Sequence, residues 1–244
     1  MLVLLPPSET KRPGGVGVSI DKLAIIWAAL DPARVEIFSR LDVLLESPET
    51  AIRSLKLGNK PDHALEAMAT LQTSPTMPAI ERYSGVLFEA LDYTTLSEKA
   101  KTRVERQLFI QSALFGLLPA TEMIPDYKFS ATAKMEGLSL KSLWNQAHEA
   151  VWPRMIGPIL DMRSESYRTL APIPPRESYF VEVLDSKSGR ALNHFNKKAK
   201  GAFARKAMEL GIESVSDVPE IAKAAGFKAK LDGSRVLFII PPGF

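Results

Sequence analysis

The densest group of cations in this chain lies in residues 196–206, which read NKKAKGAFARK. Lysine and arginine side chains without acidic neighbours can bind anions, above all phosphate groups. No acidic residue interrupts the segment, so a phosphate-binding surface and an ordinary solvated helix face are the two interpretations to weigh. The basic side chains concerned are Lys197, Lys198, Lys200, Arg205 and Lys206.

The spacing in this basic segment predicts a helix that starts at Asn196 and ends before Gly211. Asparagine is favoured just before a helix, and glycine just after one. The first turn would then hold Lys197, Lys198 and Lys200, although the positive end of the helix dipole disfavours cations there. A bound phosphate would accept the free N–H groups and neutralise the lysines.

The two faces of this predicted helix differ in character. Gly201 lies with the lysines and Arg205, where a missing side chain would let the backbone of a ligand approach closely. The opposite face would pack in the core, and Lys206 leans toward it. The residues predicted for that apolar face are Ala199, Ala202, Phe203, Ala207 and Leu210.

A second polar segment, PPSETKR, directly follows the apolar run LVLL at residues 2–5. In α/β sheets, the loops that leave the C-terminal ends of strands build ligand sites, so this segment is a candidate wall of the same site. A plain turn is the competing interpretation, because the residues are turn formers. The PGGVG that follows is not a Walker loop, since no Gly-Lys-Ser/Thr closes it. The candidate side chains are Ser8, Thr10, Lys11 and Arg12.

The segment FGLLP at residues 115–119 places Gly116 between apolar residues. A glycine that links two short helices in this way can present backbone N–H groups to a DNA phosphate, as in a helix-hairpin-helix element. An ordinary helix end followed by Pro119 explains the same residues. Both interpretations place Gly116 at the end of a helix.

Polar side chains also cluster at the ends of other predicted strands. Their convergence is typical of an active site, so an enzyme acting on a nucleotide or another phosphorylated metabolite is the alternative to a DNA-binding protein. His194 could serve as an acid or base, although a histidine at a strand end is more often structural. The additional candidates for the cleft wall are Ser164, Tyr167, Asn193 and His194.

The sequence contains no cysteine, which excludes disulfides, thiolate catalysis and cysteine-based metal sites. The histidines His63, His148 and His194 are far apart in the sequence and fit no metal-binding spacing. No serine-hydrolase motif is present. We therefore expect no metal, no cofactor and no catalytic residue of a familiar kind.

The composition is that of a globular protein, with 244 residues of which 45% are hydrophobic and 24% charged. The net charge is only +3, so attraction to nucleic acid must come from a local patch. The opening MLVLLPP lacks a basic stretch and is too short for a signal peptide or a membrane span. We expect a cytoplasmic protein with no membrane partner, and a monomer in preference to an oligomer.

Strand patterns occupy both ends of the chain and helical patterns its middle, which predicts one mixed α/β domain over residues 1–244. Residues 2–5 form an apolar run typical of a buried strand. Helical spacing dominates residues 21–152, and TSPTMP is a linker within the domain. The helical runs are residues 61–72, 79–91 and 97–118.

After residue 152 the pattern returns to strands, beginning with GPILDM at residues 157–162. The segments SYFVEVL and RALNHF flank DSKSG, which predicts a hairpin over residues 178–195. Near the C-terminus, FKAKL and SRVLFII flank Asp232-Gly233, and this dipeptide is the strongest hairpin signal of the chain.

Several of these stretches together resemble the YaaA family of peroxide-stress proteins, in the same order and over nearly the whole chain. The most specific are ALFGLLPATEMIPDYK at residues 113–128 and HFNKKAKG at residues 194–201. LVLLPPSETK, YSGVLFEALD and LDMRSESY add to the resemblance. The chain departs from the family where it carries PSETK after the first strand and Leu118 before the proline of FGLLP.

The resemblance implies a single α/β domain with a basic cleft, a helix-hairpin-helix element and binding to double-stranded or distorted DNA. It also implies a role in limiting oxidative DNA damage during hydrogen peroxide stress. From residues and resemblance together we expect a DNA-binding stress protein that contacts the phosphate backbone with little sequence preference. The predicted contacts are Lys11, Arg12, Gly116, Asn196, Lys197, Lys198, Lys200, Gly201 and Arg205.

Overall fold

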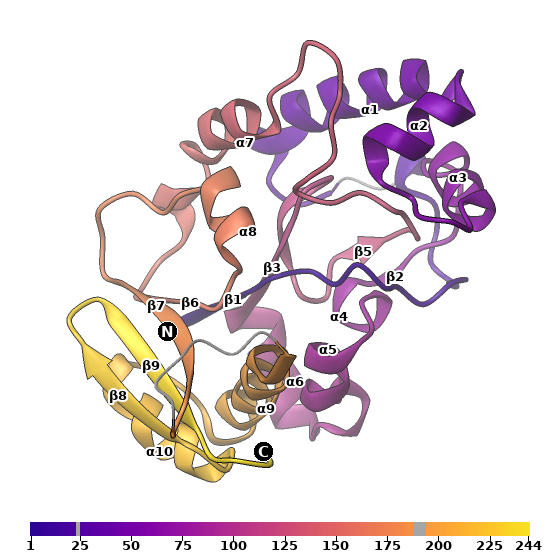
Figure 1. Cartoon of the computed structure of the whole chain (residues 1–244). Helices are drawn as coiled ribbons and strands as arrows, with labels where there is room; N and C mark the ends of the chain where they lie inside the picture. Colours follow the sequence, from indigo (N-terminus) through magenta and orange to yellow (C-terminus); the bar gives the residue numbers. More distant parts are fainter. Residues whose placement is uncertain (23–24, 188–193) are drawn as a thin grey trace.

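Both ends of the chain and one segment of its middle meet in a central mixed sheet (Figure 1). The structure is a computed structural model that describes residues 1–22, 25–187 and 194–244. Within these residues the sheet has seven strands in the order β4-β3-β1-β6-β7-β9-β8. The strands are β1 Leu2–Leu5, β3 Leu108–Ser112, β4 Gly116–Pro119, β6 Ile159–Asp161, β7 Ser178–Asp185, β8 Lys228–Asp232 and β9 Arg235–Ile240.

The five strands from β3 to β9 in this order run parallel to one another, while β4 and β8 run antiparallel at the two edges. The predicted buried strand at residues 2–5 is confirmed as β1, which pairs with β3 on one side and β6 on the other. Val3, Leu4 and Leu5 have no exposed surface, because helices cover both faces of a parallel sheet.

The order of the strands creates a switch point between β1 and β6. After β1 the chain builds outward through β3 to the β4 edge, and after β6 it adds β7, then β8 at the far edge, and last β9 between them. The loops that follow β1 and β6 therefore diverge. A crevice at the C-terminal ends of two such strands is the usual ligand site of an open α/β sheet.

Helices surround this sheet, with α7 and α8 on one side and α6 and α9 on the other (Figure 1). A small second sheet pairs β2 Met77–Pro78, within the predicted linker TSPTMP, with β5 Met123–Ile124. No helix in the described part of the chain is long and apolar enough to cross a membrane. The α-helices are α1 Asp31–Leu45, α2 Pro48–Leu55, α3 Asp62–Ala69, α4 Ala79–Arg82, α5 Val86–Leu91, α6 Glu98–Gln107, α7 Leu140–His148, α8 Glu165–Leu170, α9 His194–Leu210 and α10 Val218–Ala224, and short 3-10 helices occupy Ile20–Lys22, Ala28–Leu30, Tyr93–Thr95, Trp152–Arg154 and Val215–Asp217.

The prediction of one helix over residues 97–118 is wrong beyond Gln107, where α6 ends. The chain then forms β3, all five residues of which are buried, and turns back as β4. A continuous apolar run fits a strand buried on both faces better than a helix with one apolar stripe, and the charged first half alone has the helical pattern. The sheet therefore also takes strands from the middle of the chain, which was expected to be helical.

The helix-hairpin-helix prediction for FGLLP is also wrong. Gly116 begins β4 and pairs with Ser112 across the turn at residues 113–115, so no two helices meet here. A Cβ built on Gly116 would lie 2.8 Å from side-chain atoms of both Leu30 and Trp144. Gly116 is buried and cannot reach a DNA phosphate, because the core covers it.

Of the two predicted hairpins, the C-terminal one is confirmed. Strands β8 and β9 pair antiparallel, with Asp232 opposite Arg235 next to the turn. The hairpin over residues 178–195 is wrong. Its first strand, β7, lies between β6 and β9 and is parallel to both, which leaves no edge for an antiparallel partner. Residues 188–193 lie outside the described part, and His194 opens α9.

Helix α9 packs closely against α5, and Gly201 is the reason that it can. A Cβ built on Gly201 would lie 2.1 Å from the carbonyl oxygen of Leu87 and 2.9 Å from the Cβ of Ala90. Gly201 is therefore a helix-packing residue and not a point of approach for a ligand, which corrects the prediction. The C-cap prediction is confirmed, because Gly211 has φ 93° and follows the last residue of α9.

This packing predicts that Gly201→Ala destabilises the protein. Alanine normally stabilises a helix interior relative to glycine by about 1 kcal/mol. Here the added methyl group would overlap the backbone of α5, so we expect a net loss on the order of 1–3 kcal/mol in the free energy of unfolding. Urea denaturation of the wild type and the variant measures it, and a gain in stability would contradict the contact.

Candidate functional site

A cleft of about 560 Å³ lies at the C-terminal ends of β1 and β6, at the switch point of the sheet. The loop after β1 and the start of α8 form two of its walls. Asp161, the last residue of β6, pairs with Phe180 of β7, so β7 continues past the end of β6 and supplies a third wall. Helix α9 supplies the fourth, with Asn196, Lys197 and Lys200.

Lys200 is the most unusual side chain of this cleft. Only 5% of its surface is exposed, yet its amine has no hydrogen bond or ion pair within the described part of the chain. Burial lowers the pKa of Lys200 to about 8, although the carboxylate of Asp161 opposes the shift, and the cation Arg168 adds to it. Lys200 lines the cleft, so its lowered pKa belongs to a group that a ligand in the cleft would meet.

The carboxylates that line the cleft are all neutralised by cations. Each of the three lies within 4 Å of a lysine or arginine, whereas neither Lys197 nor Lys200 has an acidic partner among the described residues. The uncompensated charge of the cleft is therefore positive, which favours an anionic ligand. The pairs are Glu9 with Lys128 at 3.7 Å, Glu165 with Arg168 at 2.8 Å and Glu182 with Arg235 at 3.8 Å.

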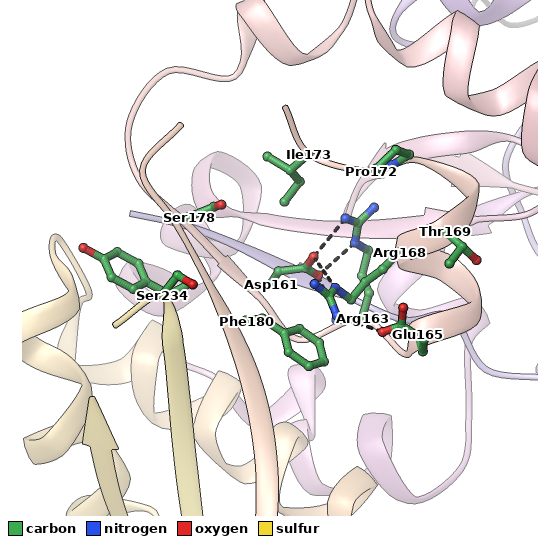
Figure 2. A pocket seen from close by; sticks show the side chains of 11 residues that line it. Asp161, Arg163, Glu165, Arg168, Thr169, Pro172, Ile173, Ser178, Phe180 and Ser234 are labelled. Carbon is green, nitrogen blue, oxygen red and sulfur yellow. Dashed lines mark hydrogen bonds and ion pairs between the residues drawn. The ribbon is translucent and has the colours of Figure 1, made fainter. Parts of the chain in front are cut away.

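A buried ion pair between Asp161 and Arg163 supports the floor of the cleft. Arg163 has no exposed surface and donates from Nε and Nη2 to the two carboxylate oxygens, at 2.8 and 2.9 Å. The same pair borders a smaller cavity of about 270 Å³, where the guanidinium of Arg168 approaches Asp161 to 3.7 Å and stacks on the ring of Phe180 (Figure 2).

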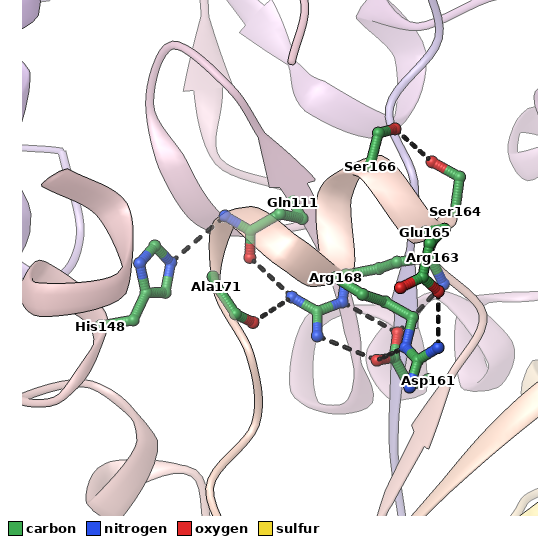
Figure 3. Close-up of polar contacts among 9 residues, drawn as sticks. All are labelled: Gln111, His148, Asp161, Arg163, Ser164, Glu165, Ser166, Arg168 and Ala171. Carbon is green, nitrogen blue, oxygen red and sulfur yellow. Dashed lines mark hydrogen bonds and ion pairs between the residues drawn. The ribbon is translucent and has the colours of Figure 1, made fainter. Parts of the chain in front are cut away.

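A chain of hydrogen bonds continues from Arg163 into the core (Figure 3). Arg163 Nη1 donates to Gln111 Oε1, and Gln111 Nε2 lies 3.2 Å from His148 Nε2. His148 Nδ1 lies 2.7 Å from the carbonyl oxygen of Trp144, which can only accept. His148 is thus the neutral Nδ1–H tautomer, and its Nε2 accepts from Gln111.

The β1 loop holds its predicted residues in internal contacts. Lys11 Nζ donates to the carbonyl oxygen of Ser8 and lies 4.1 Å from the centroid of the Tyr127 ring. Burial lowers the pKa of Lys11 to about 7, and the nearby cation Lys128 adds to the shift. The Ser8 hydroxyl contacts the Thr10 hydroxyl, which contacts the carbonyl oxygen of Ser84.

The hydroxyls of Ser8 and Thr10 thus make the internal contacts expected of a turn. The neighbouring Pro7 and Glu9 do line the cleft. Arg12 is exposed, and its backbone N–H donates to the carbonyl oxygen of Arg82. Ser164 and Tyr167 line the cleft, and Asn193 lies outside the described residues.

The basic segment is helical as predicted, but the residue at which the helix begins was predicted wrongly. Helix α9 begins at His194, so Asn196 is not its N-cap and Lys197 follows the first three residues. The argument from the helix dipole therefore does not apply to these lysines. Lys197 and Lys198 are exposed, and Lys198 Nζ lies 5.0 Å from the centroid of the Phe244 ring.

Arg205 is a structural residue rather than a free phosphate contact. Its Nη1 donates to the carbonyl oxygens of Leu91 and Asp92, at the C-terminal end of α5. The guanidinium thereby caps carbonyls that lack a partner in the helix. Arg205 Nε also pairs with Glu209 at 2.9 Å, and Lys206 pairs with the same carboxylate.

The predicted site missed the four polar residues beneath the cleft: Gln111, His148, Asp161 and Arg163. The available signal was polar residues within apolar runs, as in LFIQS and ILDMR. A buried strand tolerates such residues only when tertiary partners satisfy them. No three His, Asp or Glu side chains of the described ranges cluster closely enough to hold a metal ion.

Comparison with known proteins finds relatives along most of the chain. A family model described as "Peroxide stress protein YaaA" matches residues 1–232. A UPF0246 protein of Corynebacterium glutamicum (strain R) is 38% identical over 234 residues, which cover 93% of this chain and 93% of the relative. A UPF0246 protein of Streptomyces coelicolor is 31% identical, covering 95% and 93%, and an uncharacterized protein of Campylobacter jejuni is 26% identical, covering 82% of each.

The buried ion pair predicts that Arg163→Met destabilises the protein strongly. The substitution leaves the carboxylate of Asp161 buried without its main partner, which typically costs about 3–5 kcal/mol. The matched control is Arg168→Met, whose pairs with Asp161 and Glu165 are partly exposed. We expect the control to lose about 1 kcal/mol or less. Equal losses in urea denaturation would contradict the role of Arg163.

The buried histidine predicts a dependence of stability on pH. Burial is the main cause that lowers the pKa of His148 to about 4, from 6.5. The unfolded chain binds the proton more readily, so this contribution to stability is lost as the pH falls from 6.5 toward 4. At pH 4.5 we expect a loss of about 2–3 kcal/mol relative to pH 7 from this group.

The variant His148→Gln removes the titrating group but keeps a polar side chain. Its free energy of unfolding should therefore fall by about 2–3 kcal/mol less than that of the wild type between pH 7 and pH 4.5. Urea denaturation at both pH values measures the difference between the two proteins. Acidic residues titrate equally in both and cancel. Identical pH profiles would show that His148 is not buried as a neutral ring.

Proposed function

This chain belongs to the peroxide stress protein YaaA family, and from this premise we propose that it binds DNA during peroxide stress. The proposed interface is the cleft at the ends of β1 and β6 together with the exposed start of α9. Phosphate groups of the backbone are the proposed points of contact. Such contacts position a protein without reading bases, so the binding has little sequence preference.

The observation that carries this proposal is the imbalance of charge in the cleft. Its three carboxylates are paired with cations, and its two lysines are not paired with acids in the described part of the chain. The net charge of +3 is modest, so the local surplus and not the whole molecule would attract the nucleic acid.

Lys197 and Lys198 are the proposed phosphate contacts on α9. Both are exposed, and Lys197 also lines the cleft. Arg12 on the β1 loop is exposed as well and is a further candidate. Gly116, Gly201 and Arg205 are excluded from the proposal, because they are occupied by contacts in the core or at the end of α5.

One observation favours a second candidate, an enzyme that acts on a nucleotide or another phosphorylated metabolite. A volume of about 560 Å³ falls within the range of small-molecule pockets. The cleft also combines apolar walls with hydroxyl, amide and amine groups. Such a ligand would place its phosphate near the same lysines, so both candidates use one electrostatic feature.

The proposal predicts that replacing Lys197 and Lys198 together with alanine weakens DNA binding about equally on two unrelated duplexes. Each lost phosphate contact should flatten the slope of log affinity against log salt by roughly 0.9. Fluorescence anisotropy across a salt series measures affinity and slope. Thermal melting should be little changed, because both side chains are exposed.

A control with the same change of charge replaces Lys223 on α10 and Lys228 on β8, which are also exposed. We expect this pair to leave the slope unchanged. If both double variants behave alike, binding reflects only overall charge and the proposed interface is wrong. Wild-type protein that binds no duplex but binds mononucleotides would favour the enzyme.

A further inference from the structure

The burial of Lys200 is not explained by phosphate binding. An amine that holds a phosphate works best as a fully charged group, and exposed lysines on α9 can already do this. Lys200 is instead 95% buried, from its exposed fraction of 5%, and has no partner among the described residues. Its environment thus disfavours the charged form, which is the form a phosphate contact requires.

The surroundings of Lys200 are those that produce a nucleophilic lysine. Lys200 Nζ lies 6.0 Å from the centroid of the Phe180 ring, and the guanidinium of Arg168 lies 3.7 Å from the same centroid. An apolar wall and a neighbouring cation are the two recognised means of activating a lysine amine. With a pKa of about 8, roughly a tenth of the amines are neutral at pH 7.

We propose that Lys200 forms a Schiff base with the aldehyde of a phosphorylated sugar bound in the cleft. This inference rests on the DNA-binding function proposed above, because in DNA the group with this chemistry is the ring-opened deoxyribose of an abasic site. A free sugar phosphate carries the same aldehyde and is the other source. Both place a phosphate near Lys197 and a carbonyl carbon near Lys200, the two lysines that line the cleft.

The step needs no oxidant or reductant. The lone pair of the neutral amine forms a bond to the carbonyl carbon, and one proton passes from the nitrogen to the carbonyl oxygen to give a neutral carbinolamine. The second proton of the nitrogen then passes to the hydroxyl group, which leaves as water while the C=N bond forms. Glu9, Glu165 and Glu182 line the same cleft, and carboxylates are groups that can carry protons in such a step.

The lining of the cleft suits a sugar. Hydroxyl and amide groups can hydrogen-bond to sugar hydroxyls, and the chain segments that carry them come from α8 and α9. Pro6, Pro7 and Phe180 line the same cleft, and Lys200 is only 5% exposed, so little water surrounds the amine and loss of water from the carbinolamine is favoured. The polar groups are Ser164, Ser166 and Asn196.

Borohydride trapping tests the proposal, because sodium borohydride reduces an imine to a stable secondary amine. The full chain is incubated with a duplex that contains one abasic site, with the intact duplex, and with 2-deoxyribose 5-phosphate, and is then reduced. Peptide mass spectrometry locates the adduct. We expect it on Lys200 with the abasic duplex or the sugar phosphate, and on neither Lys200 nor any other lysine with the intact duplex.

The variant Lys200→Arg keeps the positive charge but has no nucleophilic amine. We expect its adduct yield to fall by about tenfold or more, since arginine cannot form the imine. Lys223→Arg is the matched control at an exposed position of α10 and should trap as the wild type does. Equal trapping by Lys200→Arg, or an adduct spread over exposed lysines, would overturn the proposal.

Two outcomes separate this inference from the proposed function. Wild type that binds intact duplex but shows no adduct on Lys200 with either aldehyde overturns the nucleophile and leaves DNA binding standing. Wild type that binds no duplex but traps 2-deoxyribose 5-phosphate on Lys200 supports the nucleophile and overturns DNA binding. If Lys200→Arg does not fold, the location of the adduct in the wild type still decides.

Discussion

The burial of Arg163 is the constraint on which the architecture around the cleft depends. A guanidinium is always charged, so a buried one must find acceptors in fixed positions. Arg163 takes them from three places: the carboxylate of Asp161, the side chain of Gln111 on β3 and the carbonyl oxygen of Ala171 after α8. These contacts tie the end of β6 to a strand two places away in the sheet and to the helix that forms one wall of the cleft.

The same constraint shapes the electrostatics above the sheet. Asp161 satisfies Arg163 with both oxygens, and its second oxygen also lies near Arg168. Asp161 raises the pKa of Lys200, but burial lowers that pKa by more. The lining carboxylates are paired with other cations in the same manner, which leaves Lys197 and Lys200 without an acidic partner among the described residues.

Tertiary contacts also divide the basic segment into residues with different roles. Gly201 and Arg205 were indistinguishable from ligand contacts in the sequence, but both belong to the junction of α9 with α5. Lys197 and Lys198 are exposed, whereas Lys200 is buried. A single stretch of similar residues thus supplies a packing contact, a helix cap, a charged surface and a buried amine.

The sequence by itself determined what local pattern can determine: the buried strand at the N-terminus, the C-terminal hairpin, the helix that ends at Gly211 and the polar loops after β1 and β6. Each follows from hydrophobic period or turn chemistry within a few residues. The strands at residues 108–119 and the parallel neighbours of β7 were decided only by the tertiary structure. The tertiary structure also decided the network of Gln111, His148 and Arg163 and the burial of Lys200. A buried polar group depends on partners or neighbours that are distant in the chain, which local sequence patterns do not reveal.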